Sequence, residues 1–174
     1  GAIGTLGAGT YVGGISIASG ATFRYKSTSN QTLGGAISGD GGLSMAGSRT
    51  LTLTGVNDYT GATICGGSGE ANLGTGTIEL SGSGSILNSA ITFNGGGLKL
   101  TNTVAETGSG RVADGLGITS NGGTLTYANT SGANVYAETL GPVALTTGHL
   151  SVYEATNQSS SGSQTLTLAG LTHT

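Results

Sequence analysis

The acidic side chains are the first candidates for catalysis, because carboxylates act as general acids, general bases and nucleophiles. Cleavage of a polysaccharide needs two or three carboxylates, or a carboxylate with Arg or Lys, converging on a groove. The acids of this chain are Asp40, Asp58, Glu70, Glu79, Glu106, Asp114, Glu138 and Glu154. No two of them share a local motif, and the nearest mixed clusters are Glu106 with Arg111 and Asp114, and Arg24 with Lys26. Local spacing therefore predicts no catalytic residue, although stacking of distant segments would still bring acids together.

Metal-binding and nucleophilic side chains are equally sparse. Asp40 lies in "ISGDGG", which partly resembles the Gly-Gly-x-Gly-x-Asp repeat that binds calcium. The segment occurs once, and a lone copy indicates a turn. His149 and His173 have no partner at the spacing of zinc ligands. Cys65 and a histidine supply the residue types of a nucleophilic set without any supporting pattern. The Gly-rich run at 94–97 lacks the Lys-Ser/Thr of a phosphate loop. We predict no metal site, no cofactor and no enzyme activity.

Thr-x-Thr pairs indicate one more chemistry, because flat arrays of threonine on stacked strands can bind ice. The pairs are Thr50/Thr52/Thr54, Thr75/Thr77, Thr124/Thr126 and Thr165/Thr167. Their separations are irregular, so we expect at most scattered pairs to meet on neighbouring strands. Threonine is also common at the outward positions of any β-sheet that carries few charged residues. Ice binding therefore stays a minor alternative.

The composition excludes several classes of protein. Gly, Thr, Ser and Asn make up 94 of the 174 residues, and charged residues are only 7%, against about 25% in a typical soluble domain. The formal net charge is −3 and no basic run exists, which argues against nucleic-acid binding through phosphates. No apolar stretch approaches the roughly 18 residues of a membrane helix. One cysteine excludes an intramolecular disulfide framework.

The elements that must position these residues are short strands. Apolar residues recur with a period of two in runs bounded by Gly, Asn or Ser, and no Gly-free window has helical spacing. The expected strands are 14–18, 22–25, 43–46, 50–54, 77–80, 90–93, 98–100, 124–127, 150–153 and 165–168. The chain is therefore predicted to be all-β.

The rhythm of these strands favours one all-β architecture. An immunoglobulin-like sandwich would have longer strands and more aromatic residues than the 5% found here. Short strands with a Gly at nearly every corner fit a coil that turns after each strand and stacks on its neighbours. We predict a right-handed parallel β-helix that forms a single domain over residues 1–174. With about 20–25 residues per coil, it would contain seven or eight rungs.

One segment carries a resemblance to a known family. Residues 42–64, "GLSMAGSRTLTLTGVNDYTGATI", resemble the autotransporter-associated β-strand repeat, also called the passenger-associated transport repeat. The matching positions are Gly42, Leu43, Gly47, Thr50, Leu51, Thr52, Leu53, Gly55, Asn57, Tyr59, Thr60, Gly61, Thr63 and Ile64. Residues 65–71, "CGGSGEA", depart from the family pattern. The resemblance implies a β-helical, passenger-like segment of an exported bacterial surface protein, and it implies no particular activity.

The repeat residues are expected to have structural roles. Inward positions are predicted for Leu51, Leu53 and Ile64. Turns of the coil are predicted at Gly55, Asn57 and Gly61, with Tyr59 covering the corner, and Thr60 belongs to the same turn motif.

The function expected from the sequence is that of a non-catalytic structural or adhesive element of an extracellular or cell-surface protein of a Gram-negative-type bacterium. The partners expected for adhesion are surface polysaccharide or the surface of a host or neighbouring cell. A carbohydrate-binding or carbohydrate-degrading β-helix is the alternative. The side chains best able to stack on sugars are Tyr11, Tyr25, Tyr59, Tyr127, Tyr136 and Tyr153, although packing in the core or at corners is the simpler role for each. The chain stops at "TLTLAGLTHT" without a polar cap, so we expect copies of itself end to end, forming fibres, or adjoining coils of a longer chain.

Overall fold

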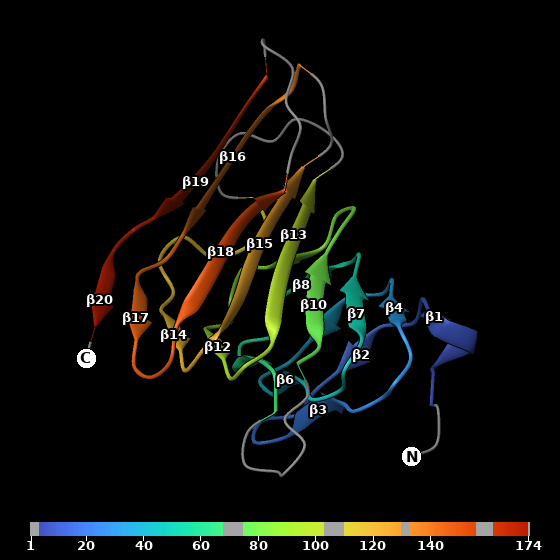
Figure 1. Cartoon of the computed structure of the whole chain (residues 1–174). Coiled ribbons are helices and arrows are strands. Elements are labelled where there is room, and N and C mark those ends of the chain that lie inside the picture. Colours follow the sequence, from blue (N-terminus) through green and yellow to red (C-terminus); the bar gives the residue numbers. More distant parts are fainter. Residues whose placement is uncertain (1–3, 68–74, 103–109, 130–132, 156–161, 174) are drawn as a thin grey trace.

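Alternation of aliphatic and hydroxyl side chains gives each short strand one apolar face, which no single strand can bury alone. In the computed structural model these strands stack in parallel along a rod (Figure 1). The structure describes residues 4–67, 75–102, 110–129, 133–155 and 162–173. A short 3-10 turn, η1 (Gly7–Gly9), precedes the first strand. Successive coils repeat every 20 to 29 residues.

Two seven-stranded parallel sheets form most of the wall. The first sheet contains β1 (Thr10–Tyr11), β4 (Gln31–Leu33), β7 (Thr50–Leu53), β10 (Thr77–Leu80), β13 (Gly97–Asn102), β15 (Gly123–Asn129) and β18 (Leu150–Ala155). The second sheet contains β3 (Thr22–Tyr25), β6 (Gly42–Met45), β9 (Thr63–Cys65), β12 (Ile91–Phe93), β14 (Ile118–Ser120), β17 (Val143–Leu145) and β20 (Leu171–His173). Every pairing is with the same side of the next coil, so the described residues form seven coils of a parallel β-helix, as predicted.

A third side closes each coil between the two sheets. Its strands pair only in twos: β2 (Ile15–Ser16) with β5 (Ile37–Ser38), β8 (Val56–Asn57) with β11 (Ser85–Ile86), and β16 (Val135–Leu140) with β19 (Ser163–Leu168). In the fifth coil the described residues of this side contribute only an isolated bridge between Ile86 and Val112. The third side is therefore the least regular of the three.

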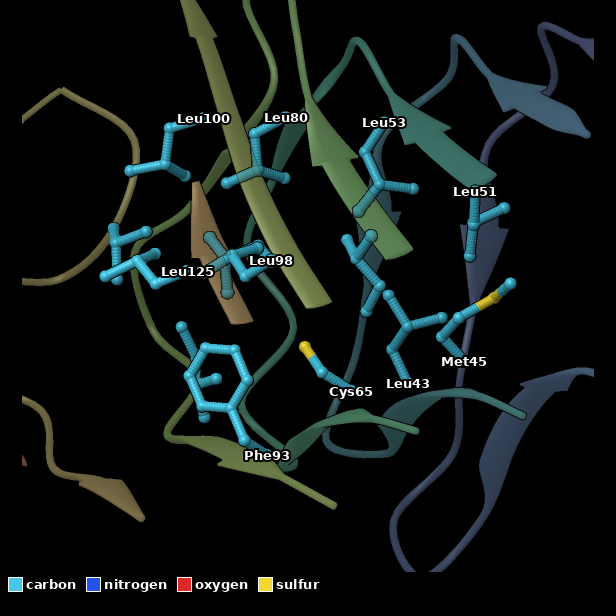
Figure 2. Packing of buried hydrophobic residues seen from close by; sticks show 14 of the residues in the cluster. Leu43, Met45, Leu51, Leu53, Cys65, Leu80, Phe93, Leu98, Leu100 and Leu125 are labelled. Atoms are coloured by element: carbon cyan, nitrogen blue, oxygen red, sulfur yellow. The ribbon is translucent and has the colours of Figure 1, made fainter. Parts of the chain in front are cut away.

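The core is built from inward columns that run along the rod in register. On the first sheet Leu53 lies beside Leu80, and Leu80 beside Leu100, and all three side chains are fully buried. The second sheet adds Met45, Cys65 and Phe93, and Figure 2 shows these side chains meeting the leucines of the first sheet. Burying one such side chain contributes roughly 1.5–3 kcal/mol, so the stacked columns are the main stabilising feature.

All ten strands expected from the sequence are present, and most of them have shifted ends. Residues 77–80 match β10 without any shift, whereas the expected strand 98–100 extends to Gly97–Asn102. The sequence pattern missed the remaining ten strands, including β16, which is six residues long. Most of the missed strands are two or three residues long, too short for alternation to be recognised.

Two of the roles expected in the repeat are wrong. Ile64 faces outward and is half-buried, because β9 turns its neighbours Thr63 and Cys65 into the core. Asn57 does not turn the coil; it lies in β8 with a buried side chain. Tyr59 is fully buried in the core cluster, which agrees with the packing role expected of the tyrosines.

Two glycines of the repeat act through close approach of neighbouring coils. A Cβ at Gly61 would lie 2.4 Å from the carbonyl carbon of Gly41, and one at Gly55 would lie 2.8 Å from the oxygen of Gly35. Real Cβ atoms do not come this close to backbone, so both corners need glycine. The predicted corner roles of Gly55 and Gly61 agree with this geometry.

Candidate functional site

The repeat asparagine connects three coils from inside the rod. Asn57 Oδ1 accepts a hydrogen bond from the Ile37 backbone N–H at 3.0 Å. Its Nδ2 donates to the carbonyls of Gly55 at 2.8 Å and Ser85 at 2.9 Å. These bonds satisfy backbone groups on the part of the third side where β5, β8 and β11 are each only two residues long. The polar atoms of this buried side chain all bond to backbone groups, so it is not accessible to a ligand.

A buried chain of hydroxyl groups follows. Tyr59 and Thr63 share a hydrogen bond of 2.6 Å, and Thr63 shares one of 2.8 Å with Ser89. Ser89 donates in turn to the Gly61 carbonyl at 2.6 Å. Burial raises the pKa of Tyr59 well above its usual range, and the hydrogen bonds from its neighbours offset this only in part. The phenol is therefore a structural donor and acceptor.

The turn motif of the repeat makes an exposed contact with the preceding coil. Thr60 Oγ1 donates to Asp40 Oδ1 at 3.2 Å, and the Thr60 backbone N–H donates to the Gly39 carbonyl at 3.0 Å. Asp40, the aspartate of the sequence that resembles a calcium-binding repeat, thus accepts a hydrogen bond from a neighbouring turn. Leu51 and Leu53 lie in the core as expected. The repeat is consequently a packing unit, and its residues do not converge on a cleft.

The accessible polar cluster lies on the outer face of the first sheet. Glu79 Oε1 accepts from the Lys99 ammonium at 2.9 Å and from Thr101 at 2.6 Å, while Oε2 accepts from Thr52 at 3.4 Å. Partial burial raises the pKa of Glu79, but the hydrogen bonds from Thr101 and Lys99 and the charge of Lys99 bring it below the ordinary value. Glu79 therefore stays ionised, which suits cross-strand pairing better than proton donation.

Threonines surround this ion pair in partial register. Thr10, Thr32 and Thr52 form one column, and Thr50 pairs with Thr77 in the next. Glu79 and Lys99 interrupt the first column, and Gly97 interrupts the second. The pair Thr165/Thr167 lies on β19, on the third side of the rod, and so cannot extend either column. The expectation of scattered rather than continuous threonine pairing is confirmed.

A second polar cluster is buried inside the rod near the ends of the long strands. Arg111 donates through Nη1 to the Gly84 carbonyl at 2.8 Å, through Nη2 to the Gly82 carbonyl at 3.0 Å, and through Nε to Asn102. Glu138 Oε1 accepts the backbone N–H groups of Arg111 at 3.1 Å and Val112 at 3.0 Å. Arg111 and Glu138 are buried, so this cluster is closed to a substrate. Sequence spacing pointed to Arg111 but not to Glu138, which is 27 residues away.

Two stacked asparagines extend that cluster toward the C-terminal end. Asn102 Nδ2 donates to Asn129 Oδ1 at 2.8 Å, and Asn129 Nδ2 donates to Gln164 at 2.9 Å. Asn102 and Asn129 occupy equivalent register positions on neighbouring strands. The ladder satisfies amides that would otherwise be costly to bury. A repeated inward asparagine is the sequence signal that would have identified it.

The remaining chemical candidates do not meet. Burial raises the pKa of the Cys65 thiol to about 12, which removes its nucleophilic form at neutral pH. His149, His173 and Asp114 are exposed, whereas Cys65 and Arg111 are buried. Glu70 and Glu106 lie outside the described residues. Within the described ranges, no three His, Cys, Asp or Glu side chains are grouped so that they could hold a metal.

The tyrosines are mostly internal. Tyr25, Tyr59, Tyr127 and Tyr136 are buried and Tyr11 is partly buried, so core packing is the role of most of them. Tyr153 is exposed on the outer face of the first sheet, beside Thr126. It is thus the tyrosine best placed to stack on a ligand.

No family model, curated protein or solved structure matches the chain. Among the described residues, no helix is long and apolar enough to cross a membrane. The architecture and the accessible surface of the rod are therefore the observations from which its function can be inferred.

Proposed function

We propose that the chain is a non-catalytic structural or adhesive element of a bacterial extracellular or cell-surface protein. The observation that carries this proposal is the use of the polar side chains. Those of the repeat join one coil to the next, and Arg111 and Glu138 are sealed inside the rod. A stiff rod with weakly charged, hydroxyl-rich faces suits spacing and surface contact.

The resemblance of residues 42–64 to the autotransporter-associated β-strand repeat supports the extracellular, Gram-negative-type assignment. Low charge and a single buried cysteine are compatible with export. Adhesion would use the outer face of the first sheet, where Glu79, Lys99, Thr126 and Tyr153 supply hydrogen-bonding groups and an aromatic ring.

A bead assay tests the adhesive part of this proposal. Beads coated with the chain are applied to a panel of immobilised bacterial and plant polysaccharides, and retention under flow is measured. The variant Thr52→Lys/Thr126→Lys alters the outer face of the first sheet, whereas Thr165→Lys/Thr167→Lys makes the same change on the third side. We expect retention on at least one surface, at least tenfold lower for the first variant and unchanged for the second.

The same panel tests the absence of catalysis. Soluble chain is incubated with each polysaccharide, and new reducing ends and unsaturated sugars are measured. We expect no product above the level of the Glu79→Gln variant. Product release by the unaltered chain that Glu79→Gln abolishes would establish the carbohydrate-degrading alternative and overturn the proposal.

A further inference from the structure

Two corners of the rod carry the same dipeptide, an asparagine followed by a glycine. Asn94-Gly95 follows β12 and Asn121-Gly122 follows β14, and these are the two Asn-Gly sequences of the chain. The register of β12 with β14 places them at equivalent corners of neighbouring coils (Figure 1). Gly95 and Gly122 have positive φ angles of 84° and 101°, so the backbone of each corner favours glycine. The fold itself therefore keeps both Asn-Gly sequences.

An Asn-Gly sequence can react with itself, because glycine has no Cβ to hinder its backbone nitrogen. That nitrogen attacks the side-chain carbon Cγ of the asparagine. An N–C bond forms, the Cγ–Nδ2 bond breaks, and ammonia leaves with the proton of the glycine N–H. Water then opens the cyclic imide and leaves aspartate or isoaspartate. Water is the one reactant that the chain does not supply.

The two glycine nitrogens are held differently. The Gly95 N–H donates to the Gly122 carbonyl on the next coil at 2.7 Å, so attack by this nitrogen breaks a bond between coils. The Gly122 N–H donates at 3.3 Å to the Ser120 hydroxyl of its own turn. Asn121 is also exposed, whereas Asn94 is half-buried. The nitrogen that attacks Asn121 is therefore released at the lower cost.

The side-chain carbonyl of Asn121 is the better prepared of the two for this attack. The Thr146 hydroxyl lies within hydrogen-bonding distance of Asn121 Oδ1 and, at 3.0 Å, of the Ser120 carbonyl, so these two oxygens share its hydrogen. The Thr147 hydroxyl donates to Asn121 Oδ1 at 3.5 Å. Attack on Cγ places negative charge on Oδ1, and a hydroxyl that is already in place stabilises that charge.

We propose that Asn121 is a site of spontaneous covalent modification, at which the Gly122 nitrogen displaces the side-chain amide and the Thr146 hydroxyl stabilises the oxyanion. Asn94 has the same dipeptide sequence, and the bond from Gly95 to the next coil protects it. This inference goes beyond the proposed function, because it concerns a chemical change within the rod and requires no ligand.

The modification changes how the fourth and fifth coils meet. Asn121 Nδ2 donates to Asn94 Oδ1 at 2.7 Å. Aspartate at position 121 has an oxygen in place of this nitrogen, so the bond is lost and two acceptors face each other. Aspartate at position 94 has the opposite effect, because a carboxylate is the stronger acceptor for the Asn121 amide. Reaction at Asn121 therefore loosens this corner, and reaction at Asn94 would not.

Incubation of the folded chain in heavy-oxygen water at mildly alkaline pH tests the site. The label enters the carboxylate that water creates, so peptide mass spectrometry after digestion in ordinary water distinguishes this reaction from deamidation during digestion. We expect label at Asn121 to accumulate about tenfold faster than at Asn94, or more. Thr146→Val should slow the reaction at Asn121 by about threefold or more, whereas Thr146→Ser keeps the hydroxyl and should leave the rate unchanged.

Thermal unfolding tests the consequence for the fold. Asn121→Asp reproduces one product of the reaction, and we expect it to lower Tm by about 2 °C. Asn94→Asp is the matched control, since it adds the same charge at the equivalent corner and keeps the bond from the Asn121 amide. We expect this control not to lower Tm.

Four results would overturn the proposal. Label at both asparagines at equal rates, or first at Asn94, would show that the bond from Gly95 gives no protection. Absence of label at Asn121, after a peptide of residues 116–127 has reacted completely, would show that the fold prevents the reaction. An unchanged rate in Thr146→Val, with native circular dichroism, would remove the role of the hydroxyl. Equal Tm values for Asn121→Asp and Asn94→Asp would show that the amide bond does not join the coils. Each result leaves the bead and polysaccharide assays, and hence the proposed function, unaffected.

Discussion

The narrow coils near the N-terminus and the wide coils near the C-terminus fill their interiors differently. In the narrow coils, strands of two to four residues enclose aliphatic side chains, with Asn57 and a hydroxyl chain as the main polar contents. In the wide coils, strands of six or seven residues also enclose Arg111, Glu138 and the asparagine ladder. A broader coil has inward positions beyond the aliphatic column, and each polar group there must find a partner on another coil. Breadth is thus accompanied by a buried polar network.

The largest effect on stability is expected in the fifth coil, where the buried polar network lies beside a third side without a regular strand among the described residues. Arg111→Met removes the donors that satisfy Gly82, Gly84 and Asn102, in the coil whose described third side has only the bridge at Val112. We expect a loss of about 3–5 kcal/mol in the free energy of unfolding, measured by urea titration. Arg111→Lys keeps the charge without the planar fork and should recover only part of it. A cost below about 1 kcal/mol for Arg111→Met would show that the wide coils do not depend on this network.

The aliphatic column is the feature that both regions share. Leu53 in a narrow coil and Leu100 in a wide one are both fully buried and belong to one column through Leu80. We therefore expect Leu53→Ala and Leu100→Ala to cost similar amounts, about 2–5 kcal/mol each. The outward control Thr54→Ala should change stability by no more than about 0.5 kcal/mol. Unequal leucine costs would mean that breadth alters apolar packing as well as polar content.

Close approach of backbones is found at corners of the narrow and the wide coils, and Gly61 tests it in a narrow one. Gly61→Ala would bring a Cβ to 2.4 Å from the backbone of Gly41, whereas a Cβ at Gly115 meets nothing within 4 Å. We expect Gly61→Ala to destabilise by about 1–3 kcal/mol, and Gly115→Ala to be neutral or slightly stabilising. Thermal unfolding of the two single variants provides the comparison. A neutral Gly61→Ala would show that the corner relaxes and that coil spacing is not fixed by glycine.

Asn57 tests how far the narrow coils rely on polar contacts of their own. Asn57→Ala leaves the Ile37 N–H and the carbonyls of Gly55 and Ser85 without this partner, at a cost of about 1–3 kcal/mol. Asn30 also accepts a bond across coils, from the Thr50 N–H at 3.1 Å, but it is exposed. Asn30→Ala should therefore cost less, about 0.5–1 kcal/mol by urea unfolding. Equal costs would show that burial does not set the value of these cross-coil bonds.

The fold could be predicted from the sequence because its signal is local and repeated. Leu51 and Leu53 alternate with threonine, and glycine follows at the corner, so β-structure and stacking can be inferred from a few residues. Ile64 shows the limit of this reasoning. An aliphatic residue after a turn was assigned to the core, but register with Ser44 and Thr92 places it outside. In a strand of three residues, an error of one position reverses every side chain.

The polar clusters could not be predicted because their members are one coil apart. Arg111 meets Glu138, and Glu79 meets Lys99 and Thr52, through register that depends on coil lengths varying between 20 and 29 residues. No short motif encodes such a pairing.

The smallest predicted effect concerns the ion pair on the outer face, where the narrow and wide coils meet. The pKa of Glu79 is lowered in the folded chain, so the carboxylate stabilises the fold above its ordinary value of 4.5, and this contribution is lost as the pH falls through the folded pKa. The pair is partly solvated, so Glu79→Gln should cost only about 0.2–1 kcal/mol at neutral pH and almost nothing in acid. Urea titrations at several pH values, combined with Lys99→Met in a double-mutant cycle, measure this difference. If Lys99→Met alone left the acid dependence unchanged, the lowered pKa would come from Thr101 and Thr52, and the hydroxyl face would act as a ladder of donors without its lysine.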